Sequence, residues 1–433
     1  MPRHEFGRTA QSAIYRAGSF GHRPKVPTDS VALEEAARKA MSTRGFAYVA
    51  GSAGGESTAR ANRTAFDRWR VTPRLLVDTS ERDTGIELFG RRHDSPLLVA
   101  PVGVLSMAHP EADLAVARGA KQQGITPILS TQASVPMEEV AAELGGAGHW
   151  YQLYWSSNDD LVESLVHRAQ ACGSEALVIT LDTGYLGWRP RDLDLGHLPF
   201  ASGAGIAQYT SDPVFRRLVA ERVAAKAGAE PEPQPRPTPG AVRTLVSMSR
   251  NHPGTTRHNL SAPEPRSAVE TFLDVFSRPS LTWEDVRRAR DLTTLPIVLK
   301  GILHPDDATR AVDEGVDGIY VSNHGGRQVD RSVAALDALP AVTSAVRSAG
   351  SGIPIIFDSG VRTGADAFIA LARGADAVAI GRPHVYGLAL AGADGVAQVF
   401  RDIRAELDLT MALTGCTSIA DVTSERLVEV LPG

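Results

Sequence analysis

Eight short apolar segments recur along the chain, and each one ends in polar residues or glycine. Longer segments rich in Ala, Leu, Glu and Arg separate them, which indicates strands that alternate with helices. The apolar runs are continuous, as is typical of strands covered on both faces in a parallel sheet. We expect these strands at residues 97–100, 126–129, 150–153, 176–181, 296–299, 318–321, 354–357 and 377–380.

Eight strand–helix units in 433 residues favour an α/β fold of the closed (β/α)8 TIM barrel type over an open doubly wound sheet. No GxGxxG motif follows the first strand, which argues against a dinucleotide-binding sheet. In a barrel the residues that follow the strands meet at one rim, where the active sites of this fold lie. The polar strand ends are therefore expected to form one site.

The composition argues against several other classes of protein. A hydrophobic content of 43% supports a large core, and a net charge of −5 gives no reason to expect nucleic acid as a partner. No apolar run is long enough for a membrane span or resembles a secretory leader, so we expect a soluble, cytoplasmic protein. Cys172 and Cys416 are far apart in sequence and support neither a disulfide nor a metal site.

The stretch Ser-Asn-His-Gly-Gly-Arg-Gln at 322–328 follows the sixth strand. His324 can change charge near neutral pH, and Arg327 offers a planar fork to a carboxylate. Glycine between them lets the backbone approach a ligand closely. Taken alone, the stretch also fits an ordinary loop with a solvated arginine. Lys300 adds weight to a site, because an ammonium at the end of an apolar strand is costly unless it faces an anion.

Glycine and arginine also follow the seventh and eighth strands, at 360–364 and at Gly381-Arg382. Backbone N–H groups at such turns bind phosphate, and this position in a barrel is a frequent phosphate site. Glycine-rich turns are equally common for structural reasons, so the pattern alone leaves both interpretations open.

The connection after the fourth strand is several times longer than the others, and we expect a partly ordered lid at 184–295 rather than a separate domain. Its centre, 228–240, alternates proline with other residues, which favours polyproline II structure over helix, while 211–227 and 267–276 look helical. Residues 1–95 are expected to form a helical extension packed on a barrel at 96–433. A helix at 30–42 would be capped by Asp29 or Ser30, and 46–51 would lead into a loop.

The segments VAPVG, YQLY, TLDT, VLKG, FDSGVR and IGRP occur in this order together with the 322–328 stretch. With these motifs the chain resembles the FMN-dependent α-hydroxy-acid oxidizing enzymes from about Val31 to its C-terminus. The resemblance implies a TIM barrel with FMN as cofactor, a small 2-hydroxy acid and O2 as substrates, and no metal. It also implies a homo-oligomer, a tetramer or an octamer.

The resemblance also assigns roles to individual residues. His324 would be the catalytic base, Asp182 would pair with its imidazolium form, and Lys300 would lie beside the N1/O2 edge of the flavin. The residues expected to bind the substrate are Tyr48, Tyr154, Arg189, His324 and Arg327, of which Tyr154 would contact the reacting hydroxyl. The residues expected to bind the cofactor are Pro101, Val102, Gly103, Ser130, Gln152, Thr180, Lys300, Ser322, Asp358, Ser359, Gly360, Arg362, Gly381 and Arg382.

Within the family, residues 193–200 and 205–209 resemble the extended loop of lactate 2-monooxygenases, which convert lactate and O2 to acetate, CO2 and water. The alternatives are an oxidase or dehydrogenase that releases the 2-oxo acid and, more distantly, a non-catalytic flavin-binding barrel. Two positions depart from the glycolate oxidase pattern. Gln132 replaces a tryptophan that lines the substrate, which argues against long or aromatic substrates, and Gly103 is expected to leave room for oxygen.

Overall fold

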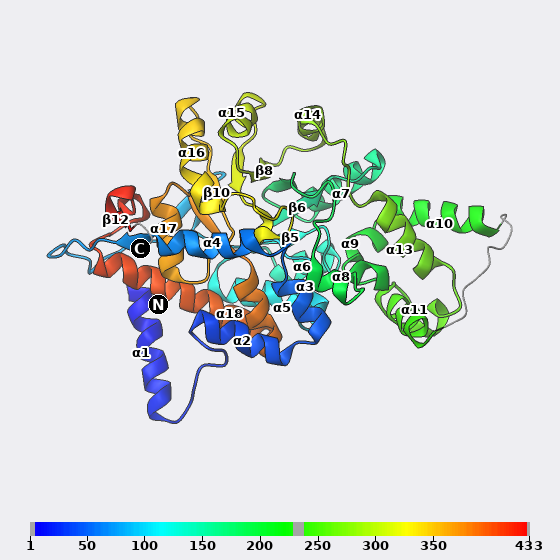
Figure 1. The fold of residues 1–433 in the computed structure, drawn as a ribbon, viewed down its shortest axis with the longest axis horizontal. Coiled ribbons are helices and arrows are strands. Elements are labelled where there is room, and N and C mark those ends of the chain that lie inside the picture. The colour runs from blue at the N-terminus through cyan, green and yellow to red at the C-terminus, as the bar shows by residue number, and fades with distance from the viewer. Residues whose placement is uncertain (1–4, 228–237, 431–433) are drawn as a thin grey trace.

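The computed structural model describes residues 5–227 and 238–430, and a closed barrel of eight parallel strands lies at its centre (Figure 1). The strands follow one another around the barrel in chain order, and β11 pairs with β4 to close it. The predicted TIM barrel is therefore confirmed. Its strands are β4 (Leu97–Val99), β5 (Thr126–Ser130), β6 (Trp150–Tyr154), β7 (Leu177–Thr180), β8 (Ile297–Ile302), β9 (Gly318–Val321), β10 (Ile355–Phe357) and β11 (Ala377–Ile380).

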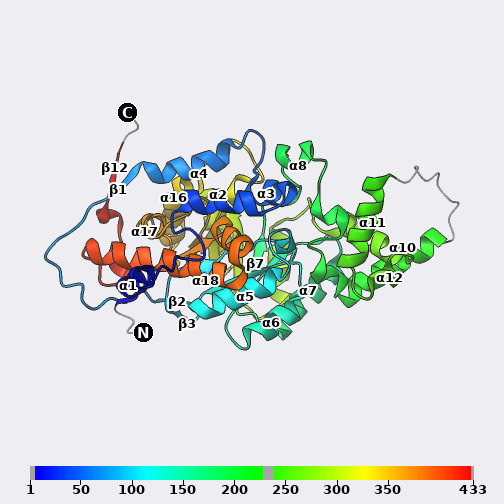
Figure 2. The ribbon, with the colours of Figure 1, turned by 90° about the horizontal axis from the view of Figure 1, so that it is seen from below.

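A helix follows each barrel strand and covers the sheet from outside, as Figures 1 and 2 show from perpendicular directions. The last of them is long and also packs against the first barrel helix and against the N-terminal helices. These helices are α5 (Ala112–Gln123), α6 (Met137–Leu144), α7 (Asp159–Ala171), α14 (Trp283–Leu292), α15 (Pro305–Asp313), α16 (Ala335–Ser348), α17 (Gly364–Ala372) and α18 (Arg382–Leu413).

The inward-facing side chains change character along each strand, because alternate residues of a strand face the same side. In β6, Trp150 lies in the apolar interior cluster and is followed on the same side by Gln152 and Tyr154. In β9, Tyr320 is followed in the same way by Ser322. The barrel is thus filled with apolar side chains at its N-terminal end and lined with polar groups at its C-terminal rim.

The segment before the barrel closes the N-terminal end of the barrel and also reaches its C-terminal rim. The hairpin of β2 (Ile86–Leu88) and β3 (Arg91–His93) packs Leu88 and Phe89 against the interior cluster. Helices α1 (Phe6–Ser19) and α2 (Ser30–Ala40) pack against α18. α3 (Thr43–Ala50) lies near α8 (Pro190–Asp194), a short helix of the long connection after β7. α4 (Ser57–Asp67) lies beside the 324–326 turn. β1 (Trp69–Val71) pairs antiparallel with β12 (Leu427–Glu429).

The long connection after β7 is largely helical and projects from one end of the molecule in Figures 1 and 2. α10 (Pro213–Ala227) packs against α13 (Glu264–Val275), as does α11 (Pro239–Asn251). The shorter helices of this insertion are α8 (Pro190–Asp194), α9 (Ala207–Thr210) and α12 (Thr256–Asn259). The connection's last helix, α14, is a barrel helix, and the lid function of the preceding segment stays a prediction.

Two local expectations differ from the structure. Residues 46–50, expected to lead into a loop, belong to α3, whose first turn is capped by Ser42 accepting a hydrogen bond from Gly45 N. Residues 228–237 of the proline-rich stretch lie outside the described residues. The end of this stretch does not continue as polyproline II but begins α11 at Pro239. Proline is well tolerated in the first turn of a helix, and Thr238 provides the cap. The helix at 30–40 forms as expected, with Asp29 as its cap.

Candidate active site

A cavity with about 960 Å³ of empty space opens at the C-terminal rim of the barrel. It contains every residue expected to bind the substrate and most of those expected to bind the cofactor. Ser130, Gln152, Thr180 and Ser322 are the exceptions, since they are buried in the barrel at the strand ends. Lining groups come from α3, from the loops after several strands and from the insertion. The lining includes Tyr48, Pro101, Val102, Gly103, Gln132, Tyr154, Leu186, Arg189, Lys300, His324, Arg327, Asp358, Ser359, Gly360, Arg362, Gly381 and Arg382.

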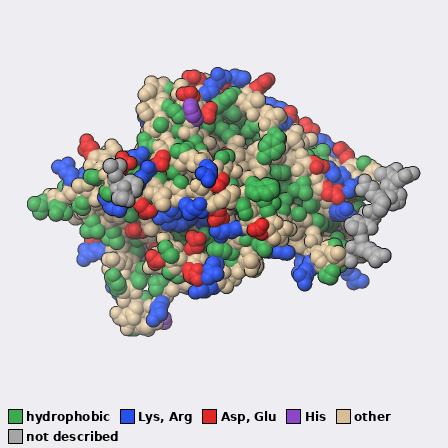
Figure 3. Space-filling view, in the orientation of Figure 1, with side chains coloured by type: hydrophobic (Ala, Val, Ile, Leu, Met, Phe, Trp, Pro, Cys, Tyr) green, Lys and Arg blue, Asp and Glu red, His purple; other side chains and the backbone are tan. Residues whose placement is uncertain are grey.

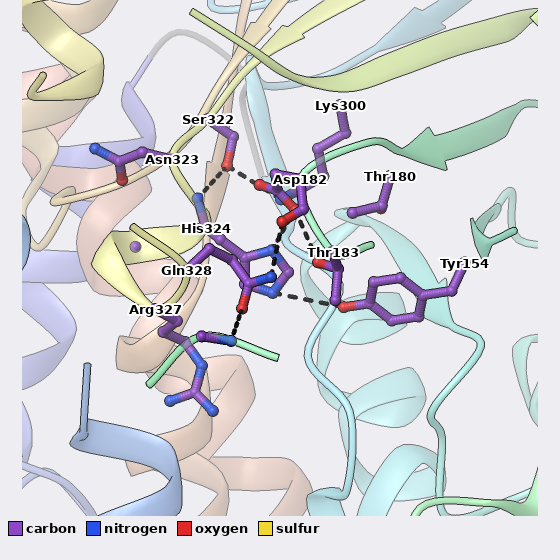
Figure 4. Close-up of polar contacts among 12 residues, drawn as sticks. Tyr154, Thr180, Asp182, Thr183, Lys300, Ser322, Asn323, His324, Arg327 and Gln328 are labelled. Carbon is purple, nitrogen blue, oxygen red and sulfur yellow. Dashed lines mark hydrogen bonds and ion pairs between the residues drawn. The ribbon is translucent and has the colours of Figure 1, made fainter. Parts of the chain in front are cut away.

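His324 lies between a carboxylate and a phenol, as Figure 4 shows. Its Nδ1 is 2.9 Å from Asp182 Oδ1, and its Nε2 is 3.5 Å from the Tyr154 hydroxyl. A carboxylate only accepts hydrogen bonds, so Nδ1 carries the proton and the neutral ring keeps a lone pair on Nε2. The backbone of His324 has φ +58, a conformation that is uncommon for residues other than glycine and occurs often at functional sites.

The charges around His324 favour a neutral imidazole beside an ionised carboxylate. Burial and the positive charges of Lys300 and Arg189 lower the pKa of His324 below its usual value, although Asp182 opposes them. Burial alone would raise the pKa of Asp182. The charge of Lys300, with hydrogen bonds from His324 and Thr183, outweighs burial and holds that pKa below its usual range. A neutral ring of this kind is ready to take a proton.

Two arginines face the cavity from different loops. Arg327 donates to the carbonyl oxygens of Tyr48 and Gly51, and its guanidinium lies 4.9 Å from the centre of the Tyr48 ring. Arg189 is 7% exposed, and burial together with the charge of Arg327 lowers its pKa to about 10, so it stays protonated near neutral pH. Two like charges in one cavity, one buried and one partly buried, are costly without an anion between them. The pair is therefore suited to a carboxylate.

Gln328 belongs to the 322–328 stretch, but no role is predicted for it from the sequence. Its amide donates to the carbonyl oxygens of Asp182 (2.7 Å) and Tyr185 (3.0 Å). Its oxygen accepts from Arg189 Nη2 (2.8 Å) and from Gly187 N (3.3 Å). Gln328 thus joins the loop after β7 to the loop after β9. Only the contact between the two loops reveals this role, and no spacing in the sequence signals it.

Below the cavity, polar side chains of neighbouring strands bond to one another. Gln152 accepts from Ser130 Oγ (3.1 Å) and donates to Thr180 Oγ1 (3.0 Å). Lys300 is 3% exposed and donates to Ser322 Oγ (3.0 Å), with Asp358 at 4.0 Å. These residues form a polar floor with one buried ammonium, which fits a flat, polar ring system that gains negative charge when reduced.

The far end of the cavity fits a phosphate. A Cβ on Gly381 would meet nothing closer than Ala100 Cβ at 4.0 Å, so glycine keeps this end open. Burial lowers the pKa of Arg382 to about 10 and also lowers that of Arg362, as expected for cations that face an anion site. Arg382 donates to Val49, Gly51, Ser52 and Gly325, whereas the guanidinium of Arg362 donates, among the described residues, only to the Val361 carbonyl. Arg362 therefore has more guanidinium donors left for a phosphate than Arg382 has.

The expectation that Gly103 leaves room for oxygen is not met. A Cβ at Gly103 would lie 2.8 Å from Gln132 Cβ and 2.9 Å from Gln132 O. Glycine is required here because Gln132 packs directly against it. The space that a larger residue would occupy is already filled by Gln132.

Comparisons with known proteins agree with this geometry. The model of the FMN-dependent dehydrogenase family matches residues 37–429. The chain is 42% identical to an L-lactate oxidase of Lysinibacillus sphaericus over 397 residues, 92% of each chain. It is 40% identical to an FMN-dependent alpha-hydroxy acid dehydrogenase of Penicillium citrinum over 422 residues, covering 97% of this chain and 95% of the relative. The crystal structure of mandelate oxidase with (S)-4-hydroxymandelic acid superposes with a TM-score of 0.74 at 35% identity, covering 94% of this chain and 99% of that one.

The fold and site define a flavin-dependent oxidoreductase barrel, and the chain belongs to the FMN-dependent α-hydroxy-acid oxidizing family. FMN fits the residues present: the polar floor suits its ring, and the open, arginine-lined end suits its phosphate. No helix of the described residues is long and apolar enough to cross a membrane. In Figure 3 acidic and basic side chains are interspersed over the face in view. Cytoplasmic location and homo-oligomer formation stay predictions.

Proposed function

We propose that this protein oxidises a small L-2-hydroxy acid with O2 and keeps the 2-oxo acid long enough to decarboxylate it, as a lactate 2-monooxygenase does. The observation that carries the proposal is the convergence of a neutral His324 and two arginines in one cavity. The arginines bind the carboxylate, and Tyr154 directs the C2 hydroxyl toward His324. His324 Nε2 takes up the proton, and Asp182 stabilises the imidazolium that forms.

FMN, when bound, would supply the acceptor for the two electrons of the oxidation, with O2 as the final acceptor. The buried ammonium of Lys300 lies where it can stabilise the negative charge that this transfer creates. Whether the proton that His324 removes comes from the C2 hydroxyl or from C2 itself does not alter the roles of these residues.

The position of the insertion supports the monooxygenase outcome. Phe200 of the insertion packs edge-on against Tyr48, with 6.4 Å between the ring centres. Ala207 N also donates to Ala133 O, and Gln208 accepts from Met137 N, so the insertion is bonded to the loop after β5. A wall held in this way slows product release. A 2-oxo acid that remains beside hydrogen peroxide is decarboxylated by it, and lactate then yields acetate, CO2 and water.

A second candidate is an oxidase that releases the 2-oxo acid and hydrogen peroxide. The names of relatives favour it, because the L-lactate oxidase of Lysinibacillus sphaericus is 42% identical. Aerobic incubation of the FMN-loaded protein with L-lactate separates the two. Acetate and CO2 in equal amounts support the monooxygenase, whereas pyruvate and hydrogen peroxide in equal amounts support the oxidase.

The same preparation tests the more distant alternative, a barrel that binds flavin without catalysis. Anaerobic addition of L-lactate or another small 2-hydroxy acid should bleach the yellow oxidised flavin. A protein that binds FMN but is bleached by none of these acids would contradict the proposed oxidation.

A further inference from the structure

Gln132 has a side-chain amide at the cavity wall that lacks a hydrogen-bond partner. It follows Ser130 by two residues, so it continues the inward-facing side of β5 beyond the end of the strand. Gln132 is 6% exposed and lines the cavity together with Tyr154 and Arg189. Within residues 5–227 and 238–430, its Nε2 is buried and bonded to no other group.

The position of Gln132 is fixed from several sides. Its N–H donates to Ser130 Oγ (3.1 Å), and its carbonyl oxygen accepts from Val104 N (2.8 Å). A Cβ on Gly103 would lie 2.8 Å from Gln132 Cβ, and a Cβ on Gly205 would lie 3.1 Å from its carbonyl oxygen. Glycines from the barrel and from the insertion thus make room for this residue, and its backbone and Cβ are held at the cavity wall.

A buried amide without a partner is energetically unfavourable, and an apolar side chain of the same size avoids this cost. A ligand that supplies the partner removes this cost. In the proposed function the substrate carboxylate is bound by Arg189 and Arg327, and the C2 hydroxyl faces Tyr154 and His324. The substituent on C2 is the part of the substrate left for Gln132.

We propose that Gln132 selects 2-hydroxy acids that carry a hydroxyl on carbon 3, of which L-glycerate is the smallest. A hydroxyl both donates and accepts, so it matches either end of the amide. The methyl group of lactate, or any other alkyl substituent, leaves the amide unpaired. This inference rests on the proposed function, because it takes the placement of the carboxylate and of C2 from it.

The test compares L-glycerate with L-2-hydroxybutyrate, since the two differ by a hydroxyl in place of a methyl group of similar size. The rate of anaerobic FMN reduction divided by the dissociation constant is measured for each acid. We expect the wild-type holoenzyme to favour glycerate by about tenfold or more, and Gln132→Met to abolish this preference while 2-hydroxybutyrate still reduces the flavin. A wild-type preference for 2-hydroxybutyrate, or an unchanged ratio in Gln132→Met, overturns the inference.

A binding measurement separates this inference from the proposed oxidation. Hydroxypyruvate and 2-oxobutyrate, the corresponding oxidation products, are titrated against the oxidised holoenzyme and followed by the flavin absorption spectrum, which needs no turnover. Tighter binding of hydroxypyruvate supports the inference even if no hydroxy acid reduces the flavin, in which case only the proposed oxidation fails. Equal affinities in the wild type overturn it, and this result does not depend on whether Gln132→Met folds. If Gln132→Met changes the affinity for FMN but leaves the preference for glycerate over 2-hydroxybutyrate unchanged, the amide contacts the flavin and not the substrate. That result also overturns the inference.

Discussion

At the scale of single residues, the site depends most on the His324–Asp182 pair. Nδ1 of His324 is held by Asp182, so the base at Nε2 faces the cavity with a fixed orientation. We expect His324→Ala to retain FMN and to slow flavin reduction by the 2-hydroxy acid on the order of 10²- to 10⁴-fold, the range for loss of a general base. Stopped-flow absorbance of the anaerobic reaction measures this rate. Reduction at the wild-type rate would remove His324 from the mechanism.

The same pair sets the pH dependence of the reaction. His324 accepts a proton only when neutral, so the reaction is active above the pKa of His324 and is lost as the pH falls through it. Because burial and the charges of Lys300 and Arg189 lower this pKa, the acidic limb of kcat/KM should lie below pH about 6.5, the usual value for histidine.

Lys300 provides a test of the direction in which the pKa of His324 is shifted. Its positive charge lowers the pKa of His324, so Lys300→Met should move the acidic limb of the kcat/KM profile to higher pH. The limb is measured with one substrate in buffers of constant ionic strength. A limb that moves to lower pH, or not at all, would contradict the electrostatic account of this site. FMN content of the variant must be measured first, because Lys300 lies in the cofactor cavity.

At the scale of elements, the site depends on how two loops are held together. Gln328 bonds both Asp182 and Arg189 from the loop after β9, and Arg189 Nε donates to the Arg327 carbonyl (3.1 Å). We expect Gln328→Met to raise KM for the hydroxy acid about 10- to 100-fold with a smaller effect on kcat, because it frees Arg189 rather than the base. Steady-state kinetics measure both constants, and tryptic cleavage after Arg191 reports whether the loop has loosened.

Gln398 offers a matched control for this variant. It is an amide on α18 that accepts from Lys25 N (2.8 Å) and donates to Val26 O (2.7 Å), away from the cavity. Gln398→Met should remove a similar number of hydrogen bonds and leave KM unchanged. If both variants raise KM equally, Gln328 acts through general stability and not through Arg189.

The elements also show what a sequence can predict. The strands were predictable because burial on both faces requires continuous apolar runs, and the rim residues were predictable because they follow those runs. The sequence predicts only that residues 46–51 lead into a loop, since this short, aromatic segment has little helical periodicity of its own. α3 forms there because Ser42 caps it and because its aromatic rings are packed. Phe46 stacks on Tyr386, and Tyr48 meets Phe200 edge-on. The role of Gln328 depends on a contact between distant loops that no local pattern encodes.

At the scale of the whole molecule, the insertion and the barrel share one packed interface at the wall of the cavity. Phe200 contacts Tyr48 on one side and Phe272 of α13 on the other, with ring centres 5.1 Å apart. Phe272 also meets the rings of Tyr209 and Phe276 and is fully buried. The helical core of the insertion is therefore continuous with the wall of the cavity. The sequence predicts helices at 211–227 and 267–276, but not this contact with the cavity wall.

This continuity links stability to the identity of the product. Phe272→Ala should lower the free energy of unfolding by about 3–5 kcal/mol, the usual cost of removing a buried phenylalanine. It should also loosen Phe200 and Tyr48, speed the release of the 2-oxo acid and raise the yield of pyruvate relative to acetate from L-lactate. Phe368→Ala, in a fully buried position on α17, is the matched control. Because Phe368 packs on the barrel and not in the insertion, its loss should lower Tm similarly without changing the products. Equal shifts in product ratio for the two variants would show that global loosening, and not the insertion, controls product release.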